Sequence, residues 1–388
     1  MTVNLLRRLK KKFQTKKWCR RDVTGLNVLI NLFKVIGLFP CAIDTSVSLK
    51  FFPSRLCVFH HVALIVILGY FNFFVGIPAI IRSKRTSGAL NLGNILELIY
   101  VGTSTAIVIL IWIVYILFRS KLTGFGNRVV GTDAITRRFG DNYQLESVKT
   151  QWIVFGIIYL IIFNFFLFSD IFFRNQVTSQ VLPSIILLLF VIQYTLIVQI
   201  MRRRVRALNK MILRNDRNPG NDEIFRTFES WREAQDQIYE AGVVIADFYS
   251  FPILFVMGLA VYGVVYNSYY LLKHWNRDDY QVRTYFRLLD DAVWIAHFLI
   301  PIVLLVVEID DLLHEVKEKA VVCRKLLVRY QEHQELRCQI KKYLYELLHE
   351  NINFTAFGFF LLNRTVLHSM FATTVTYLVL ILYYLNPR

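Results

Sequence analysis

The chain has 388 residues, of which 55% are apolar and 19% are charged, and its mean hydropathy is +0.44. These values exceed what a soluble domain of this length needs and are typical of an integral membrane protein. The net charge of +17 raises the question of nucleic-acid binding. Lysines and arginines, however, lie in blocks beside long apolar runs, as they do in cytoplasmic loops of membrane proteins. We therefore expect membrane lipid, and no nucleic acid, as a partner.

Sequence motifs for catalysis or cofactor binding are missing from the chain. It contains no G-x-x-x-x-G-K, H-E-x-x-H or C-x-x-C motif, the patterns that mark phosphate, zinc and redox sites. We expect no enzymatic activity, no metal and no cofactor.

Seven apolar runs have the length of a membrane-spanning helix, which needs about 20 residues. In chain order they are Leu56–Ile81, Asn94–Phe118, Trp152–Phe173, Leu182–Met201, Ala241–Leu272, Val293–Leu313 and Thr365–Leu385. A shorter run, Leu26–Ile43, contains polar residues at a spacing that favours an amphipathic or re-entrant helix at the inner surface over an eighth span.

The distribution of basic residues predicts the orientation. With seven spans and a cytosolic N-terminus, most lysines and arginines fall on the cytosolic side, as the positive-inside rule requires. The cysteines fall on the same side or at its membrane edge, where thiols stay reduced. The predicted fold class is an all-α membrane protein with seven transmembrane helices, a cytosolic N-terminus and an extracellular C-terminus.

Two long segments on the inner side carry a helical pattern. Met201–Tyr239 and Glu308–Glu350 are rich in helix formers, with apolar residues at helical spacing and charges between them. We expect these segments to extend the spans into the cytosol as a helical bundle.

Charged residues at the inner ends of the spans suggest two further features. Glu308, Asp310 and Asp311 precede a basic helix, which favours an ion-pair network over a metal or proton site. The run Arg202-Arg203-Arg204 predicts an anchor at the inner leaflet.

The C-terminal residues carry a recognisable pattern. The stretch Phe354-Thr355-Ala356-Phe357-Gly358-Phe359-Phe360-x-Leu362 is followed by Arg364 and, near the end, by Thr376-Tyr377. This pattern resembles the C-terminal signature of the insect gustatory receptor family, which is related to the insect odorant receptors, and Leu32–Pro40 is similar to that family's opening segment. Where the family motif ends in Gln-Phe, this chain has Tyr383-Tyr384. It also lacks the Glu of the sugar-sensing branch, which makes a sugar receptor the less favoured subtype.

The resemblance implies a taste receptor that acts as a ligand-gated, non-selective cation channel in the plasma membrane of sensory neurons. Its implied partners are a small-molecule tastant, permeant cations and further subunits, in a homotetramer or a heterotetramer with related chains. The implied organisation has five parts: a cytosolic N-terminus with the amphipathic or re-entrant helix (1–55), spans one to four with a cytosolic extension as the ligand-binding bundle (56–240), spans five and six (241–313), cytosolic anchor helices with the start of the last hairpin (314–364), and the pore-lining helix (365–388).

The last span carries the candidate pore residues. They recur at three- and four-residue steps, so they can share one face of a helix. In a pore, hydroxyl groups would support hydrated ions, and an apolar or aromatic ring would gate. From the residues alone, ordinary helix packing is the favoured explanation of these small and hydroxyl residues. The pore and gate candidates are Ser369, Thr373, Thr376, Leu380, Tyr383 and Tyr384.

Polar and aromatic residues in the outer halves of the other spans are the candidate ligand pocket. Polar groups at membrane depth are costly and suggest a function, and aromatic rings offer stacking faces. The alternative is an interfacial belt of tyrosine and tryptophan. The pocket candidates are Tyr100, Thr103, Asp170, Gln193, Tyr262, Tyr266, Trp294 and His297.

Two other classes of protein compete with a channel. A G-protein-coupled type of chemoreceptor also has seven spans, but it requires an extracellular N-terminus, which the charge distribution opposes. A membrane enzyme or transporter finds no support, since the chain shows neither an internal repeat nor a cluster of His, Asp and Glu.

Overall fold

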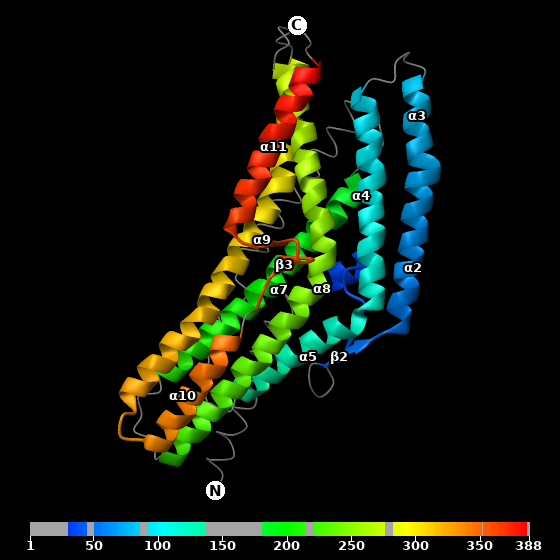
Figure 1. Ribbon diagram of the computed structural model, residues 1–388. Coiled ribbons are helices and arrows are strands. Elements are labelled where there is room, and N and C mark those ends of the chain that lie inside the picture. The colour runs from blue at the N-terminus through cyan, green and yellow to red at the C-terminus, as the bar shows by residue number, and fades with distance from the viewer. Residues whose placement is uncertain are drawn as a thin grey trace.

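The structure is a computed structural model that describes residues 30–44, 50–85, 92–136, 181–214, 221–275, 282–350 and 352–385. The described part is almost entirely helical (Figure 1). Its elements are β1 (Cys41–Asp44), β2 (Lys50–Pro53), α2 (Arg55–Gly69), η1 (Tyr70–Gly76), α3 (Ile77–Arg85), α4 (Leu92–Leu117), α5 (Arg119–Thr136), α7 (Val181–Arg214), α8 (Asn221–Trp275), α9 (Val282–Arg329), α10 (Gln334–His349), β3 (Thr355–Ala356), β4 (Phe360–Leu361) and α11 (Arg364–Leu385).

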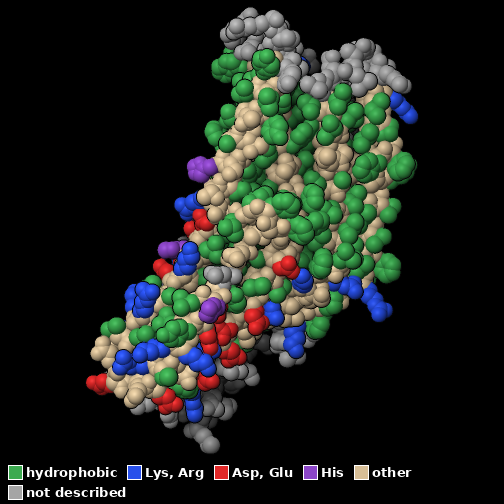
Figure 2. All heavy atoms as spheres, in the orientation of Figure 1, with side chains coloured by type: hydrophobic (Ala, Val, Ile, Leu, Met, Phe, Trp, Pro, Cys, Tyr) green, Lys and Arg blue, Asp and Glu red, His purple; other side chains and the backbone are tan. Residues whose placement is uncertain are grey.

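The molecule has an apolar half and a charged half. Figure 2 shows hydrophobic side chains over the upper part of the view, whereas Lys, Arg, Asp and Glu gather over the lower part. Helices α8 and α9 run through both halves (Figure 1). The 55 residues of α8 correspond to a length of roughly 80 Å, far more than the roughly 30 Å of a bilayer core. The predicted extension of the spans into a helical bundle is therefore confirmed.

Six helical stretches within the described residues are long and apolar enough to cross a membrane. They are Arg55–Arg82, Ile95–Leu117, Val181–Leu213, Ile224–Lys273, Tyr285–Arg329 and Arg364–Tyr383. Each contains most or all of one predicted span. The remaining predicted span, Trp152–Phe173, lies outside the described residues.

Helix α7 forms the centre of the packing. In its most apolar window 78% of the residues are buried inside the protomer, because α4, α8 and α9 all contact it. Its side chains share one continuous apolar core with those helices. By contrast, α11 and the α2–η1–α3 stretch lie on opposite edges of the apolar half (Figure 1), and only 11% of the most apolar window of each is buried.

The N-terminal run Leu26–Ile43 differs from the amphipathic surface helix expected of it. Within its described part, only residues 30–36 and the one-turn cap that follows are helical in character, and the chain then extends into β1. Phe33, Leu38 and Cys41 are buried in the main apolar core. Much of the apolar side of this run therefore packs against protein, although Leu32 and Val35 are exposed.

Two buried side chains satisfy the backbone where this segment turns. The indole Nε1 of Trp112 donates to the carbonyl of Ile36 at 3.0 Å, and the Gln193 amide donates to the carbonyl of Leu38 at 2.8 Å. Gly37 has a φ of +82°, and a Cβ there would lie 2.8 Å from Trp112 Nε1. The turn thus requires glycine for its backbone angle and for the close approach of the indole.

Candidate ligand pocket and pore helix

An aromatic cluster joins α4, α8 and α9 near their ends in the apolar half. The Tyr100 ring stacks on Tyr262, with ring centroids 6.3 Å apart and an angle of 8° between planes, and Tyr262 continues onto Tyr266 at 6.4 Å. On the α9 side, Phe298 meets Tyr100 edge-on at 6.0 Å and also contacts Trp294 at 6.1 Å. Three helices far apart in sequence therefore share one aromatic wall.

Every member of this cluster except Phe298 carries a polar side-chain atom. His297 lies edge-on to Phe298 at 5.2 Å and beside Trp294 at 5.3 Å. The hydroxyl groups of Tyr100 and Ser184 share a hydrogen bond of 2.7 Å, which connects the cluster to the first turn of α7. An aromatic wall with a few polar groups is the composition expected of a site for a small, mostly apolar molecule.

A glycine on α8 lets Phe298 approach the cluster. A Cβ on Gly263 would lie 2.5 Å from Cε2 of Phe298, closer than any real contact. The Phe298 ring therefore packs directly against the backbone of α8. The size of residue 263 determines how closely Phe298 can approach α8.

Five of the eight predicted pocket residues come together in this way, namely Tyr100, Tyr262, Tyr266, Trp294 and His297. Thr103 lies one turn along α4, and its hydroxyl donates to the carbonyl of Ile99 at 2.7 Å. Asp170 lies outside the described residues.

Gln193 belongs to a separate polar network. It accepts a hydrogen bond from Tyr115 at 2.5 Å, and the Tyr115 hydroxyl also lies 3.1 Å from that of Tyr249. Tyr115 is about four helical turns from Tyr100 along α4. Gln193 therefore faces the N-terminal turn and not the aromatic cluster.

Ser184 and Phe298 belong to this cluster but are not among the residues predicted from the sequence. Phe298 follows His297 directly and stands four residues after Trp294, so a search for aromatic residues on the same helical face finds it. Ser184 offers a weaker signal, a lone hydroxyl that follows Pro183 at the start of a long apolar run.

Helix α11 touches the rest of the protomer along one side only. Val366 and Met370 are buried, and Thr374 and Leu378 are half-buried, against α8 and α9. The described pore candidates lie on the outward side as a group: Ser369, Thr373, Thr376, Leu380 and Tyr383 are all exposed. The side chain of Tyr384 lies outside the described part of the structure.

The exposed hydroxyl groups of α11 are oriented by their own backbone. Thr373 donates to the carbonyl of Ser369 at 2.8 Å, and Thr376 donates to that of Ala372 at 2.9 Å. Because the protons are used within the helix, the oxygen atoms act as acceptors toward the outside. No Asp, Glu, Lys or Arg occurs between Thr365 and Leu385, so this face offers neutral acceptors, which suit cations better than anions.

The hairpin before α11 fastens that helix to α8. Phe357 adopts a φ of +52°, which is unfavourable for a residue with a side chain. Its backbone N–H donates to Ser250 Oγ at 2.9 Å, and its ring meets Phe251 edge-on at 5.1 Å. Residues of the C-terminal signature thus form the hairpin that holds the start of α11.

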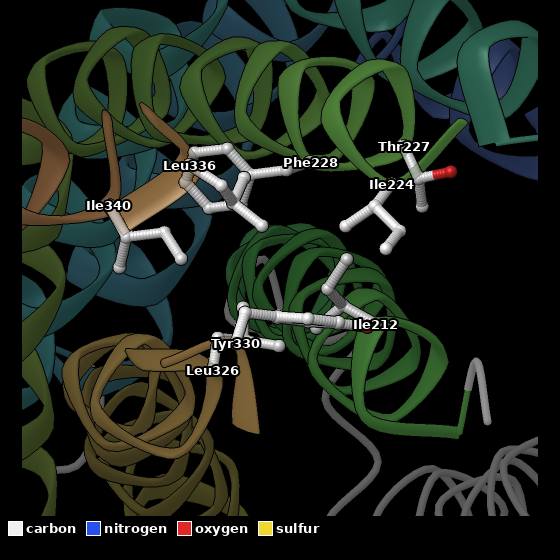
Figure 3. A pocket seen from close by; sticks show the side chains of 8 residues that line it. All are labelled: Ile212, Ile224, Thr227, Phe228, Leu326, Tyr330, Leu336 and Ile340. Carbon is white, nitrogen blue, oxygen red and sulfur yellow. The ribbon is translucent and has the colours of Figure 1, made fainter. Parts of the chain in front are cut away.

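The charged half contains a narrow apolar crevice between α7, α8, α9 and α10 (Figure 3). The lining side chains point toward one another, and only Thr227 and Tyr330 among them carry a polar group. It lies at the far end of the molecule from the aromatic cluster, and it fits the role of core packing in the charged half. The lining residues are Ile212, Ile224, Thr227, Phe228, Leu326, Tyr330, Leu336 and Ile340.

Polar contacts hold α10 onto α8 beside that crevice. Arg232 donates to Glu346 at 2.6 Å and lies 5.4 Å from the centre of the Tyr343 ring. Burial, assisted by the carboxylates of Asp236 and Glu350, raises the pKa of the Tyr343 phenol, which therefore stays protonated. Among the described residues no group of His, Cys, Asp and Glu could hold a metal ion.

Together the fold and these sites define an all-helical, multi-pass membrane protein with an aromatic cluster in its bundle and an exposed last helix. A model of the family described as "7tm Chemosensory receptor" matches residues 26–382. The chain therefore belongs to the 7tm chemosensory receptor family; it is a chemosensory receptor and not an enzyme.

Solved structures share this fold. The insect olfactory receptor OR5 from Machilis hrabei superposes with a TM-score of 0.59 at 14% identity, over 95% of this chain and 98% of that one. The same receptor in complex with eugenol gives a TM-score of 0.59 at 14% identity, over 96% and 98%. A search of curated protein sequences finds no match.

Proposed function

We propose that this protein is a gustatory receptor that acts as a ligand-gated cation channel. A small-molecule tastant binds the aromatic cluster of α4, α8 and α9, and the exposed face of α11 lines a pore shared by several subunits. The observation that carries the proposal is the exposure of α11: a helix of spanning length on which the hydroxyl groups of Ser369, Thr373 and Thr376 are exposed. A single helix cannot enclose a water-filled path, so a homotetramer or a heterotetramer with related subunits supplies the other walls.

The path from ligand to pore runs through α8. This helix carries Tyr262 and Tyr266 of the aromatic cluster, and it is also the main contact of α11. A ligand that spreads the aromatic wall displaces α8, and with it the support of α11. The eugenol complex of the olfactory receptor shows that a receptor of this fold takes a small aromatic molecule. For this chain we propose a ligand with an apolar body and one or two hydrogen-bonding groups.

The decisive experiment is a current measurement in cells that express this chain. Ligand-evoked cation current that persists when G-protein signalling is blocked is the expected result. A current that disappears under that block would assign the protein to the G-protein-coupled class instead. An N-terminal tag that antibodies reach only after permeabilisation would support the proposed cytosolic N-terminus.

A further inference from the structure

A network of ion pairs lies where α7, α9 and α11 meet. Arg364, the first residue of α11, places Nε 2.9 Å from Oδ2 of Asp310 and Nη2 3.9 Å from Oδ1 of Asp311, both on α9. The carboxylate of Asp311 also accepts a hydrogen bond from Arg202 of α7. One carboxylate is thus shared by guanidinium groups from two different helices.

Among these ion pairs, the side chains near α7 are less exposed to solvent than Arg364 of α11. Arg202 Nη1 also lies 3.2 Å from Oε2 of Glu308, and Gln199 donates to Oε1 of Glu308 at 3.4 Å. The side chains of Arg202 and Glu308 are 17% and 12% exposed, whereas Arg364 is 64% exposed. Water screens the pairs of Arg364, while those of Arg202 are shielded and stronger. Arg202 is therefore engaged in ion pairs within the protein. The Arg202-Arg203-Arg204 run predicted an anchor at the inner leaflet instead.

Few other contacts fix the start of α11. Within the described part of that helix only Val366 and Met370 are buried, and both belong to its first two turns. The position of the start of α11 therefore depends on these two side chains, on the hairpin and on the ion pairs made by Arg364.

We propose that Arg202, Asp311 and Arg364 are positioning residues that couple α7 to the pore helix, an inference that rests on the proposed channel function. Helix α7 carries Ser184 of the aromatic cluster near one end and Arg202 further along. A shift of α7 on ligand binding moves Arg202, changes how the Asp311 carboxylate is shared, and releases or tightens Arg364. Arg202 acts on α11 only through Asp311.

The test is a double-mutant cycle on gating, repeated in a background that lacks the shared carboxylate. Arg202→Gln and Arg364→Gln are each expected to shift the half-maximal ligand concentration by roughly three- to tenfold. In the double variant the shift is expected to be clearly smaller than the product of the two single shifts. With Asp311→Asn in the background, the two effects should become independent of each other.

Three variants serve as controls. Arg324→Gln makes the same chemical change at an exposed position on α9, and its shift should stay below about twofold. Arg364→Lys keeps the charge and should recover most of the wild-type response. Exchange of the charges in Asp310→Arg with Arg364→Asp should recover part of it, which a merely structural loss would not allow.

Outcomes separate this inference from the proposed function. Absence of ligand-evoked current in the wild type contradicts the channel and, with it, the coupling to a pore helix; thermal unfolding of the purified protein in detergent then reports only whether Arg202 and Arg364 interact through Asp311 in the folded protein. Independent effects of Arg202→Gln and Arg364→Gln in both measurements overturn the coupling. Non-additivity in unfolding with independent effects on gating reduces the three residues to a structural role and overturns it as well.

Discussion

Helices α7 and α11 are both long and apolar enough to cross a membrane, yet they differ in how much of their surface is buried in the protomer. Their most apolar windows have mean hydropathies of 2.5 and 1.7, but 78% of the first and 11% of the second is buried in the protomer. Their polar side chains differ in the same sense. Ser184 and Gln193 of α7 bond to other parts of the protein, whereas Thr373 and Thr376 of α11 bond to their own helix. Hydropathy places both helices in the membrane; burial within the protomer distinguishes a central helix from one at the edge.

A matched pair of phenylalanine truncations should give the largest difference between the two helices. Phe190 on α7 is fully buried, and Phe371 on α11 is 72% exposed. Phe190→Ala should cost about 3–5 kcal/mol of stability because it leaves a cavity in the core. Phe371→Ala should change protomer stability by less than about 0.5 kcal/mol. Thermal unfolding in detergent measures both.

The same pair of variants also tests whether the exposed side of α11 is a subunit interface. If Phe371→Ala lowers the fraction of assembled oligomer and leaves protomer unfolding unchanged, the exposed side of α11 is a subunit interface at that position. Equal losses of protomer stability for the two variants would contradict the central and edge roles of the helices.

The end of α11 offers the next largest effect. Tyr383 is 75% exposed, and with Tyr384 it replaces the Gln-Phe of the family motif. If these rings narrow the closed pore, their joint replacement by Ala should raise the basal current several-fold without ligand, because the constriction becomes wider and wetter. Patch recordings at equal surface expression check this. An unchanged basal leak would remove the tyrosines from the gate.

Much of the fold was accessible from the sequence because membrane helices follow from length and apolarity. The six described spans and their long charged extensions appear where apolar runs and helical charge patterns predict them. The ion-pair network at Glu308, Asp310 and Asp311 was also predictable, since carboxylates beside a basic helix need partners. Five of the pocket candidates lie together because polar and aromatic side chains at one depth of a bundle tend to meet.

Contacts between distant segments could not be read from periodicity. The N-terminal run inserts among the helices because Trp112 and Gln193 satisfy its backbone carbonyls, and nothing within Leu26–Ile43 announces those donors. Gln193 is a pocket candidate because it is a polar residue within an apolar span. Its hydrogen bonds, however, go to Tyr115 and to the carbonyl of Leu38. The left-handed backbone of Phe357 likewise depends on Ser250, more than a hundred residues away.

Two glycines on α8 provide a moderate and specific test of the aromatic cluster. Gly263→Ala places a methyl group against the Phe298 ring, whereas a Cβ at Gly258 meets no atom within 4 Å. Both changes favour the helix by up to about 1 kcal/mol, so neither should unfold the protein. Gly263→Ala should shift the half-maximal ligand concentration by roughly three- to tenfold, and Gly258→Ala by less than about twofold. Equal shifts in a dose–response measurement would place the ligand away from Phe298.

The smallest effect is expected from removal of one hydroxyl on each side of α11. Thr376 is exposed and Thr374 is half-buried toward α8 and α9, yet both donate to the carbonyl four residues earlier. Thr376→Val and Thr374→Val therefore remove the same internal hydrogen bond and keep the side-chain volume. Thr376→Val alone would remove an acceptor from the pore, so it should lower single-channel cation conductance by up to about twofold. Because the helix loses the same bond in both variants, a reduction confined to Thr376→Val reports the pore face and not helix stability. A reduction confined to Thr374→Val would mean that the ions pass on the other side of the helix.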